Sequence, residues 1–299
     1  MQRSPERPEL VPGTARRSRL RRVAVYAIFL VGLFVVWEGL KFIGGDPWRY
    51  FGWVWHPPLK ITTVNDQSLP HLWDIAAAMG APYRRGADDS LLLHLLQKAL
   101  YTWREAAIGF LLGGLLGVSL AVAFVHYHLL ERAFVPYVVA SQTIPIVALA
   151  PMIVFFFGNT VFSVVIISTY LTFFPVTIAM IRGLRAPDPR AMELMRSYAA
   201  SRRTVLWKLR LPASLPYLFT ALKITATASI VGAIIGEGPG AIQEGLGWSI
   251  VNFNQQYVTS PSKLWAAVFV ASLLGVAFYA VVRVVELRVL RGRAEVTAG

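Results

Sequence analysis

Long apolar runs dominate the pattern of hydrophobic and polar positions along this chain. Six of these runs have about the length that a helix needs to cross a bilayer. They cover residues 23–43, 106–125, 135–157, 161–181, 217–236 and 264–285. The pattern predicts an all-α, polytopic membrane protein with six transmembrane helices. Its membrane domain extends over residues 23–285, between the terminal tails 1–22 and 286–299.

The first apolar run follows a basic segment that contains seven arginines. The run is longer than the apolar core of a signal peptide, and no small-x-small cleavage site follows it. An uncleaved signal anchor is therefore predicted. Pro5, Pro8 and Pro12 oppose helix formation, so residues 1–22 are predicted to be a disordered basic tail.

Lysine and arginine gather in alternate connections between the apolar runs. The basic connections are the N-terminal tail, residues 126–134, residues 182–216 and the C-terminal tail, whereas those near 158–160 and 237–263 contain only Lys263. Because basic loops stay on the cytoplasmic side of a membrane, both termini and residues 182–216 are predicted to be cytoplasmic. The same rule accounts for the net charge of +13, so nucleic acid is not expected as a partner.

Residues 182–216 are the one long polar and basic segment between two apolar runs. Within it, residues 189–200 show the spacing of a short helix that begins after two prolines. Ser201 is a suitable N-cap for a second helix, 202–211, which Pro212 is predicted to end. Two short basic helices held between membrane spans are typical of a docking hairpin.

The spacing within this hairpin resembles a known motif. Glu193-Leu194-Met195 is followed after three residues by Ala199, and after nine more by Leu209-Arg210-Leu211-Pro212. It is similar to the EAA loop of bacterial ABC-importer permeases, whose pattern is Glu-Ala-Ala, three residues, Gly, nine residues, Ile-x-Leu-Pro. The intervals, the glutamate and the Leu-Pro pair agree, whereas the two alanines, the glycine and the isoleucine are replaced.

The resemblance implies that the hairpin enters a cleft of a separate ATPase subunit. The residues implied in this coupling are Glu193, Leu194, Met195, Ala199, Leu209, Leu211 and Pro212. The pattern of the hairpin alone is also typical of a segment that lies on the membrane surface. Its arginines would then contact anionic membrane lipid.

Other stretches are similar to permeases of the nitrate/taurine type. They are Ile144–Pro151, Phe157-Gly158 and Phe173-Phe174-Pro175, while Arg196–Ser201 and Leu211–Thr220 most resemble permeases for riboflavin and for thiamine-pyrimidine precursors. The resemblance covers roughly residues 90–285. It implies a type I importer permease in a bacterial cell membrane, acting as a homodimer with two copies of an ATPase and with a substrate-binding protein.

The resemblance also implies a solute. Riboflavin or a related vitamin precursor is expected, with nitrate, taurine, alkanesulfonates and a pyrimidine precursor of thiamine as alternatives. ATP would be used by the separate ATPase subunit, so no cofactor is expected on this chain.

Other function classes lack their motifs in this sequence. No Gly-x-x-x-x-Gly-Lys-Ser/Thr, His-Glu-x-x-His or Gly-x-Ser-x-Gly is present, and there is no cysteine. His126 and His128 are two residues apart and no third metal ligand is evident. The spans show scattered hydroxyl groups rather than the paired carboxylates of a proton pump, and no convincing internal repeat marks a secondary transporter. An enzyme is therefore not expected.

A solute path is predicted beside the third and fifth spans. Three prolines in the third span predict a broken helix, whose freed carbonyl groups need a protein partner or a wet cavity. The candidate path residues are Ser141, Thr143, Pro145, Pro151, Thr225 and Glu237. Glu237 is expected either at the outer mouth of the path or as a solvated loop carboxylate. At most two of Thr225, Thr227 and Ser229 can face the path.

The remaining patterns concern packing. Gly109, Gly113 and Gly117 form a small-residue stripe that lets another helix approach closely. Glu38 and Lys41 are three residues apart and are interpreted as a pair that reaches toward the membrane surface. Short helices are expected near residues 69–79 and within 245–261.

Overall fold

The computed structural model describes residues 13–294 apart from 51–52, 60, 62, 85 and 239–243. Its elements are α1 (Gly13–Gly44), β1 (Trp48–Tyr50), β2 (Trp53–Trp55), α2 (Leu72–Gly80), α3 (Leu91–His126), α4 (His128–Ser141), α5 (Ile146–Phe157), α6 (Val161–Leu184), α7 (Pro189–Ser197), α8 (Arg202–Val205), the π-helical turn η1 (Leu206–Arg210), α9 (Leu211–Glu237), α10 (Gly245–Gln255) and α11 (Pro261–Ala294). The chain divides into two compact units, Met1–Asp74 and Ile75–Gly299.

The first unit consists of α1 and the segment that follows it. From Ala24 onward α1 is apolar enough to cross a membrane, and its apolar side chains are mostly exposed, as expected for a surface that faces lipid. The prediction of a disordered tail up to residue 22 is wrong for residues 13–22, because the helix begins at Gly13. Pro5, Pro8 and Pro12 lie outside the described residues.

Glu38 and Lys41 are buried at the end of α1 and do not pair with each other. The Lys41 ammonium contacts the Asp66 carboxylate and donates to the carbonyl of Leu69 at 2.7 Å. The Glu38 carboxylate lies 2.6 Å from Nδ1 of His71. The interpretation as a surface-reaching pair is therefore wrong, because residues 66–72 fold back onto the helix and give each charge its own partner.

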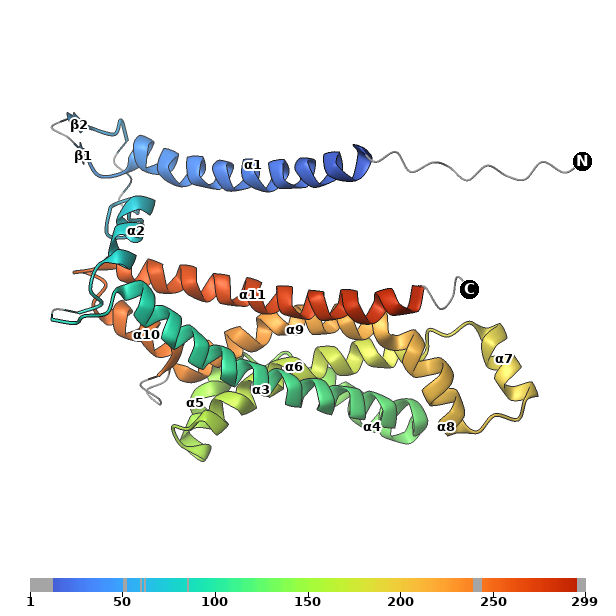
Figure 1. Ribbon diagram of the computed structural model, residues 1–299. Helices are drawn as coiled ribbons and strands as arrows, with labels where there is room; N and C mark the ends of the chain where they lie inside the picture. The colour runs from blue at the N-terminus through green and yellow to red at the C-terminus, as the bar shows by residue number, and fades with distance from the viewer. Residues whose placement is uncertain are drawn as a thin grey trace, which may run out of the picture. The chain divides into compact units, whose positions relative to one another are not determined.

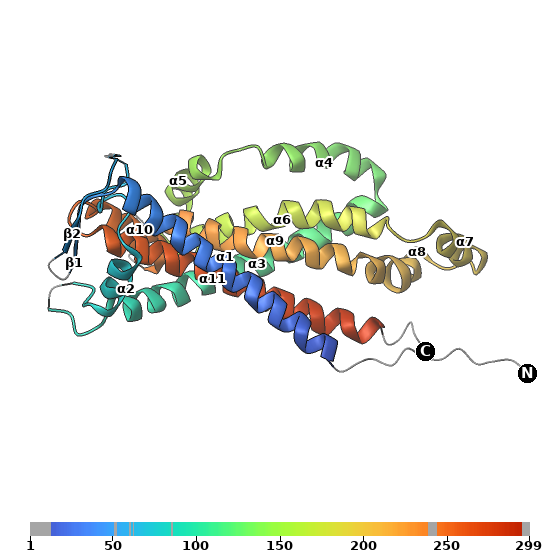
Figure 2. The same ribbon diagram turned by 90° about the horizontal axis from the view of Figure 1, so that it is seen from above.

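The second unit is a helical bundle built around α3, α6 and α9. Figures 1 and 2 show these helices and α11 running alongside one another, with α7 and α8 at one end and α10 at the other. The core holds two buried apolar clusters, one around Phe110 and Ile230 and the other around Phe124 and Met180. Both clusters draw side chains from all three helices, which fixes the spacing of the bundle.

The glycine stripe of α3 packs directly against α6. A Cβ atom on Gly109 would lie 2.4 Å from Cβ of Ser168, and one on Gly117 would lie 2.7 Å from the carbonyl oxygen of Phe173. Such distances are far below van der Waals contact, so only glycine allows this approach. The predicted close helix contact is confirmed.

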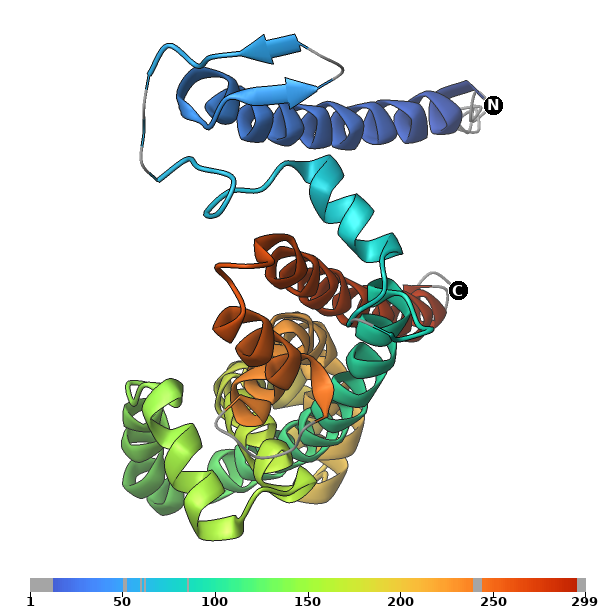
Figure 3. The same cartoon turned by 90° about the vertical axis from the view of Figure 1, so that its left-hand side faces the viewer.

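The third predicted span is broken, as the prolines indicate. Helices α4 and α5 meet at 101°, and five further helices are long and apolar enough to cross a membrane, which gives six spans if the bent pair counts as one. Pro145 is the N-cap of α5, whereas Pro136 and Pro151 lie inside their helices. Figures 2 and 3 show α4 and α5 along one edge of the bundle.

The predicted end of one helix is wrong. The helix that begins at Arg202 does not end at Pro212 but continues through α8, η1 and α9 to Glu237. In the π-helical turn the N–H of Leu211 bonds to the carbonyl of Leu206, five residues back, so the register changes just before the proline. The predicted C-terminal tail is helical up to Ala294, because α11 continues to that residue.

Candidate functional site

The hairpin is a defined structure at one end of the bundle. Its first helix, α7, begins at Asp188, whose carboxylate accepts from the N–H of Arg190 at 2.8 Å, with Pro189 in the first turn. Ser201 caps the second helix and accepts from the N–H of Thr204 at 3.2 Å, as predicted. These side chains fix both helix starts, so the hairpin presents a constant surface.

Helix α7 has two faces with different surroundings. Glu193 and Leu194 are exposed, and Leu194 keeps 57% of its surface accessible. Met192 is half-buried and lines a cavity between α7 and the bundle, and the exposed Arg196, three residues after Glu193, also reaches this cavity. The exposed face is therefore the one that another protein can reach.

The other residues implied in coupling lie at different depths. Ala199 is exposed in the turn between the two helices, and Met195 is half-buried beside it. Leu209, Leu211 and Pro212 are half-buried further along the helix. Leu211 packs against the buried cluster around Phe124 and Met180, so these three residues lie at the base of the hairpin, away from its tip.

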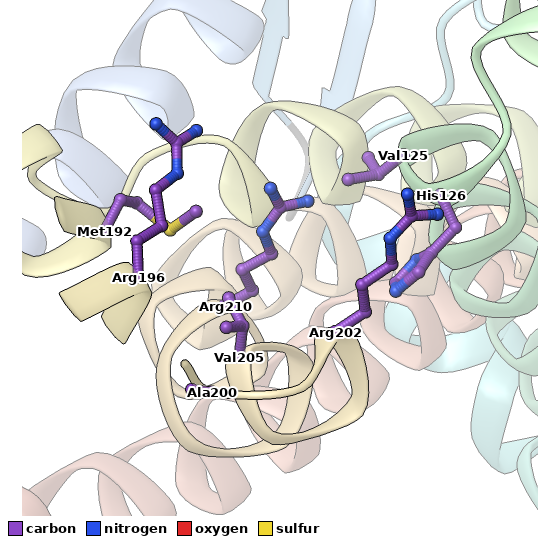
Figure 4. Close-up of a pocket in the computed structure, with 8 residues that line it drawn as sticks. All are labelled: Val125, His126, Met192, Arg196, Ala200, Arg202, Val205 and Arg210. Atoms are coloured by element: carbon purple, nitrogen blue, oxygen red, sulfur yellow. The ribbon is translucent and has the colours of Figure 1, made fainter. Parts of the chain in front are cut away.

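A cavity of about 480 Å³, the arginine cavity, lies under the hairpin. It is lined by Val125, His126, Met192, Arg196, Ala200, Arg202, Val205 and Arg210. Figure 4 shows the three guanidinium groups in a row pointing the same way, with the ring of His126 beside Arg202. The lining includes no acidic residue.

The broken span holds four of the six predicted path residues. Thr143, Pro145 and Pro151 are exposed, and Ser141 is half-buried. The hydroxyl groups of Ser141 and Thr143 donate to carbonyl oxygens of α4, at 2.8 and 2.7 Å. The hydroxyl of Tyr170 on α6 donates to the carbonyl of Ser141, which satisfies a group freed by the break.

The hydroxyl groups of α9 are divided between two surroundings. Thr225 and Ser229 are fully buried in the bundle, whereas Thr227 is exposed. Residues four apart share a helix face, which explains why the first two point the same way. Thr225, which was a candidate path residue, therefore lies in the packed core of this chain. Of these three residues, Thr227 is the exposed one.

Glu237 is buried, which contradicts its interpretation as a solvated loop carboxylate. It has no exposed surface, and its carboxylate accepts from the N–H of Gly247 at 2.6 Å. Gly245 has φ of 86°, and a Cβ atom there would lie 2.3 Å from the carboxyl carbon of Glu237. Two glycines thus let the start of α10 close over this side chain.

A second buried carboxylate, Glu105 on α3, lies close enough to Glu237 to interact electrostatically. Within the described part of the chain, both oxygens of Glu105 and one of Glu237 have no hydrogen-bond partner. The expectation that the spans hold no paired carboxylates is therefore wrong. Glu105 comes just before the apolar run 106–125, so it was not counted in that span. It is three residues after Thr102, and a helical projection that began earlier would show both residues on the buried face of α3.

The hairpin, the broken span and the bundle agree with one family of transport proteins. The family described as binding-protein-dependent transport system inner membrane component matches residues 113–291, which is more than half of the chain. The chain belongs to this family. It is the permease subunit of an ABC importer, a multi-pass inner-membrane protein that works with an ATPase and a substrate-binding protein.

Several relatives of this permease are transport proteins. A formylaminopyrimidine transport permease protein of Halalkalibacterium halodurans is 33% identical over 226 residues, which are 72% of this chain and 88% of the relative. A riboflavin transport system permease protein of Chloroflexus aurantiacus is 28% identical over 67% of this chain and 74% of its own length. The MetNI methionine ABC transporter, solved in an inward-facing conformation, is 21% identical with a TM-score of 0.49 and covers 65% of this chain and 95% of that chain.

The backbone of the permease explains one position of the family motif. Ala199 has φ of 49°, the only described non-glycine residue with a positive φ. The EAA pattern has glycine at this position, and glycine adopts this conformation without steric cost. The chain keeps the left-handed turn that joins α7 to α8 although alanine occupies the position.

We expect Ala199→Gly to stabilise the permease slightly. Relief of the left-handed strain is worth about 1 kcal/mol, and the greater freedom of glycine in the unfolded chain offsets part of this gain. Thermal unfolding of the purified protein in detergent is the measurement. Ala200→Gly, at a neighbouring position without a positive φ, is the matched control and should lower the midpoint. A lower midpoint for Ala199→Gly than for Ala200→Gly would contradict the assignment of strain.

We also expect Glu105→Gln to be tolerated. The amide can donate to the unpartnered oxygen of Glu237, a hydrogen bond worth about 1 kcal/mol, and it has nearly the same shape as the carboxyl group. The midpoint of thermal unfolding should stay the same or rise. Glu193→Gln, at an exposed position, is the control and should change nothing. A marked loss of stability in Glu105→Gln alone would mean that the ionised carboxylate is held by a bound cation.

Proposed function

We propose that this permease imports a flat, uncharged nitrogen heterocycle, either riboflavin or a pyrimidine precursor of thiamine. In this proposal a homodimer of the chain forms the path, a substrate-binding protein delivers the solute outside, and two ATPase subunits dock on the hairpins inside. The chain contributes no catalytic group and binds no cofactor. ATP hydrolysis belongs to the ATPase subunits.

The similarity to named relatives carries the choice of solute. The formylaminopyrimidine and riboflavin permeases are 33% and 28% identical to this chain, whereas an aliphatic sulfonate permease of Bacillus subtilis is 26% identical and a nitrate permease of Leptolyngbya laminosa is 23% identical. The order of these identities favours a heterocycle over an oxyanion.

The side chains of the proposed path support an uncharged solute. The predicted path residues of α4 and α5 carry hydroxyl groups and prolines, and Lys223 is the one basic residue of α5 and α9. Its ammonium lies 2.8 Å from the carboxylate of Glu286, so its charge is already compensated. An oxyanion in a membrane path needs a cation or several donors opposite it.

The exposed apolar surface of α5 supports a dimer. Val147, Phe155 and Phe156 keep 68%, 83% and 73% of their surface accessible in the single chain. In the proposed homodimer the second copy would cover part of this surface, and the broken spans of the two copies would line the path together.

The orientation follows from the charges of the hairpin. Arg196, Arg202 and Arg203 are exposed there, and an excess of arginine holds a loop on the cytoplasmic side. The exposed face of α7 with Glu193 and Leu194 is then available to a cytoplasmic ATPase. A short amphipathic helix in a cleft is a common mode of protein recognition.

Transport by the reconstituted importer tests the solute. Proteoliposomes that contain the permease, its ATPase and its binding protein should take up labelled riboflavin or formylaminopyrimidine when ATP is supplied. Nitrate and an alkanesulfonate serve as matched competitors and should not reduce uptake. ATP-driven uptake of nitrate or a sulfonate, with no uptake of either heterocycle, would overturn the proposal.

A further inference from the structure

The arginine cavity concentrates positive charge that the chain itself does not compensate. No ion pair in the described part of the chain involves Arg196, Arg202 or Arg210, whereas Arg185, which lies near Arg210, is paired with Glu131. Glu193 follows Met192 on α7 and is exposed, but it does not line the cavity and forms no ion pair with these arginines in the described part of the chain. Three guanidinium groups in a row form a site for an anion with several oxygen acceptors.

An apolar groove continues from this cavity along the bundle. The groove has a volume of about 360 Å³ and shares His126 and Arg202 with the arginine cavity. Its other walls are Val122 and Ala123 of α3, Tyr127 directly after that helix, Arg203 of α8 and Leu206 of η1. The cationic arginine cavity and the more apolar groove are therefore continuous at His126 and Arg202.

This combination matches an amphiphile with an anionic head. The apolar run 106–125 of α3 is about long enough to cross the hydrocarbon core, so His126, directly after it, lies at the depth of the head groups. Tyr127 and Trp207 are both more than 60% exposed there, and such aromatic residues are typical of the membrane interface. A soluble anion would use the arginines but would leave the groove empty.

We propose that the arginine cavity and the apolar groove together bind one anionic phospholipid per chain. Its phosphate lies against Arg196, Arg202 and Arg210, and one acyl chain runs along Val122, Ala123 and Leu206. The inference deepens the proposed function, because it places the hairpin at the inner head-group layer. The lipid then connects α7 to the bundle beside the face that meets the ATPase.

Native mass spectrometry of the purified permease tests this site. With phosphatidylglycerol and phosphatidylcholine of the same acyl chains, we expect one retained phosphatidylglycerol per chain and little phosphatidylcholine. Each lost arginine should weaken binding about fivefold, so Arg202→Gln with Arg210→Gln should weaken it about 25-fold. Arg190→Gln, on α7 but outside both hollows, is the matched control and should bind as the unaltered chain does.

Two further arms separate the lipid from other occupants. Ala123→Phe fills the groove and should weaken binding of phosphatidylglycerol, and sn-glycerol 3-phosphate should not compete at equal concentration. Equal binding of both lipids, competition by glycerol phosphate, or displacement of the lipid by the ATPase subunit would each overturn the proposal. Uptake of the solute is measured on the same variants. If a variant loses lipid binding but still selects the same solute, the lipid site and the proposed function are shown to be separate.

Discussion

A permease that carries Glu193→Lys is expected to fold and insert normally and yet to lose ATP-driven uptake. Glu193 is exposed on α7, and no ion pair within the described part of the chain involves it, so the substitution removes no internal contact. In the proposed complex its carboxylate lies in the ATPase cleft. Charge reversal in such an interface costs several kcal/mol, which corresponds to a loss of binding of about 100-fold or more.

Copurification of the ATPase and solute-stimulated ATP hydrolysis measure this loss. Asp88→Lys provides the control, because it makes the same change of charge at an exposed position just before α3, at the end of that helix away from the hairpin. We expect normal ATPase binding for this control. Full ATPase binding and full stimulation in Glu193→Lys would show that the exposed face of α7 does not meet the ATPase.

The second large effect is expected from Gly113→Ala in the contact between α3 and α6. A Cβ atom on Gly113 would lie 2.6 Å from Cβ of Thr172 and 2.7 Å from the carbonyl oxygen of Thr169. The carbonyl belongs to the backbone of a buried helix, so the two helices must separate. Such overpacking costs about 1–3 kcal/mol, and the midpoint of thermal unfolding and the amount of protein in the membrane should both fall.

Gly114→Ala is the matched control on the next residue. Its Cβ atom would lie 3.6 Å from Cδ2 of Leu222, which is ordinary contact with a flexible side chain. The midpoint should stay unchanged or rise slightly, since alanine favours a helix more than glycine does. Equal effects of the two substitutions would mean that helix propensity rather than helix contact governs this stripe.

The spans, one close helix contact and one helix cap could be predicted from short stretches of the sequence. Apolar length predicted the spans, the spacing of three glycines predicted the contact with α6, and Ser201 was predicted as a cap. Each of these depends on residues within a few turns of one another. The break of the third span could be predicted for the same reason, because proline acts on its own helix.

Features that depend on distant residues could not be predicted in this way. Glu105 and Glu237 are far apart in the sequence, and their burial results from the way α10 closes over them. Lys41 is compensated by Asp66, which lies 25 residues further along the chain. A single sequence shows each charge but not its partner, so the burial of Glu237 against Gly245 and Gly247 could not be predicted.

The continuation of the helix through Pro212 has a local cause that the pattern did not show. A proline ends a helix when its ring meets the carbonyl group four residues earlier in a regular α-helical register. Here the π-helical turn at residues 206–210 shifts that register, so Pro212 begins α9 without a break. The residues of this π-helical turn are of the same types as those of a regular α-helical turn. The sequence therefore predicts that Pro212 ends the helix, although it does not.

In the proposed complex, the exposed face of α7 lies in the cytoplasm and meets the ATPase. The chain has no cysteine, so Leu194→Cys introduces a single thiol on this face, and Val258→Cys introduces one in the connection before α11. Labelling with a membrane-impermeant maleimide is compared in inside-out and right-side-out vesicles, with and without the ATPase. We predict that Leu194→Cys is labelled only in inside-out vesicles and is protected by the ATPase, whereas Val258→Cys is labelled only in right-side-out vesicles. Labelling of Leu194→Cys from the outside, or labelling that the ATPase leaves unchanged, would contradict the account.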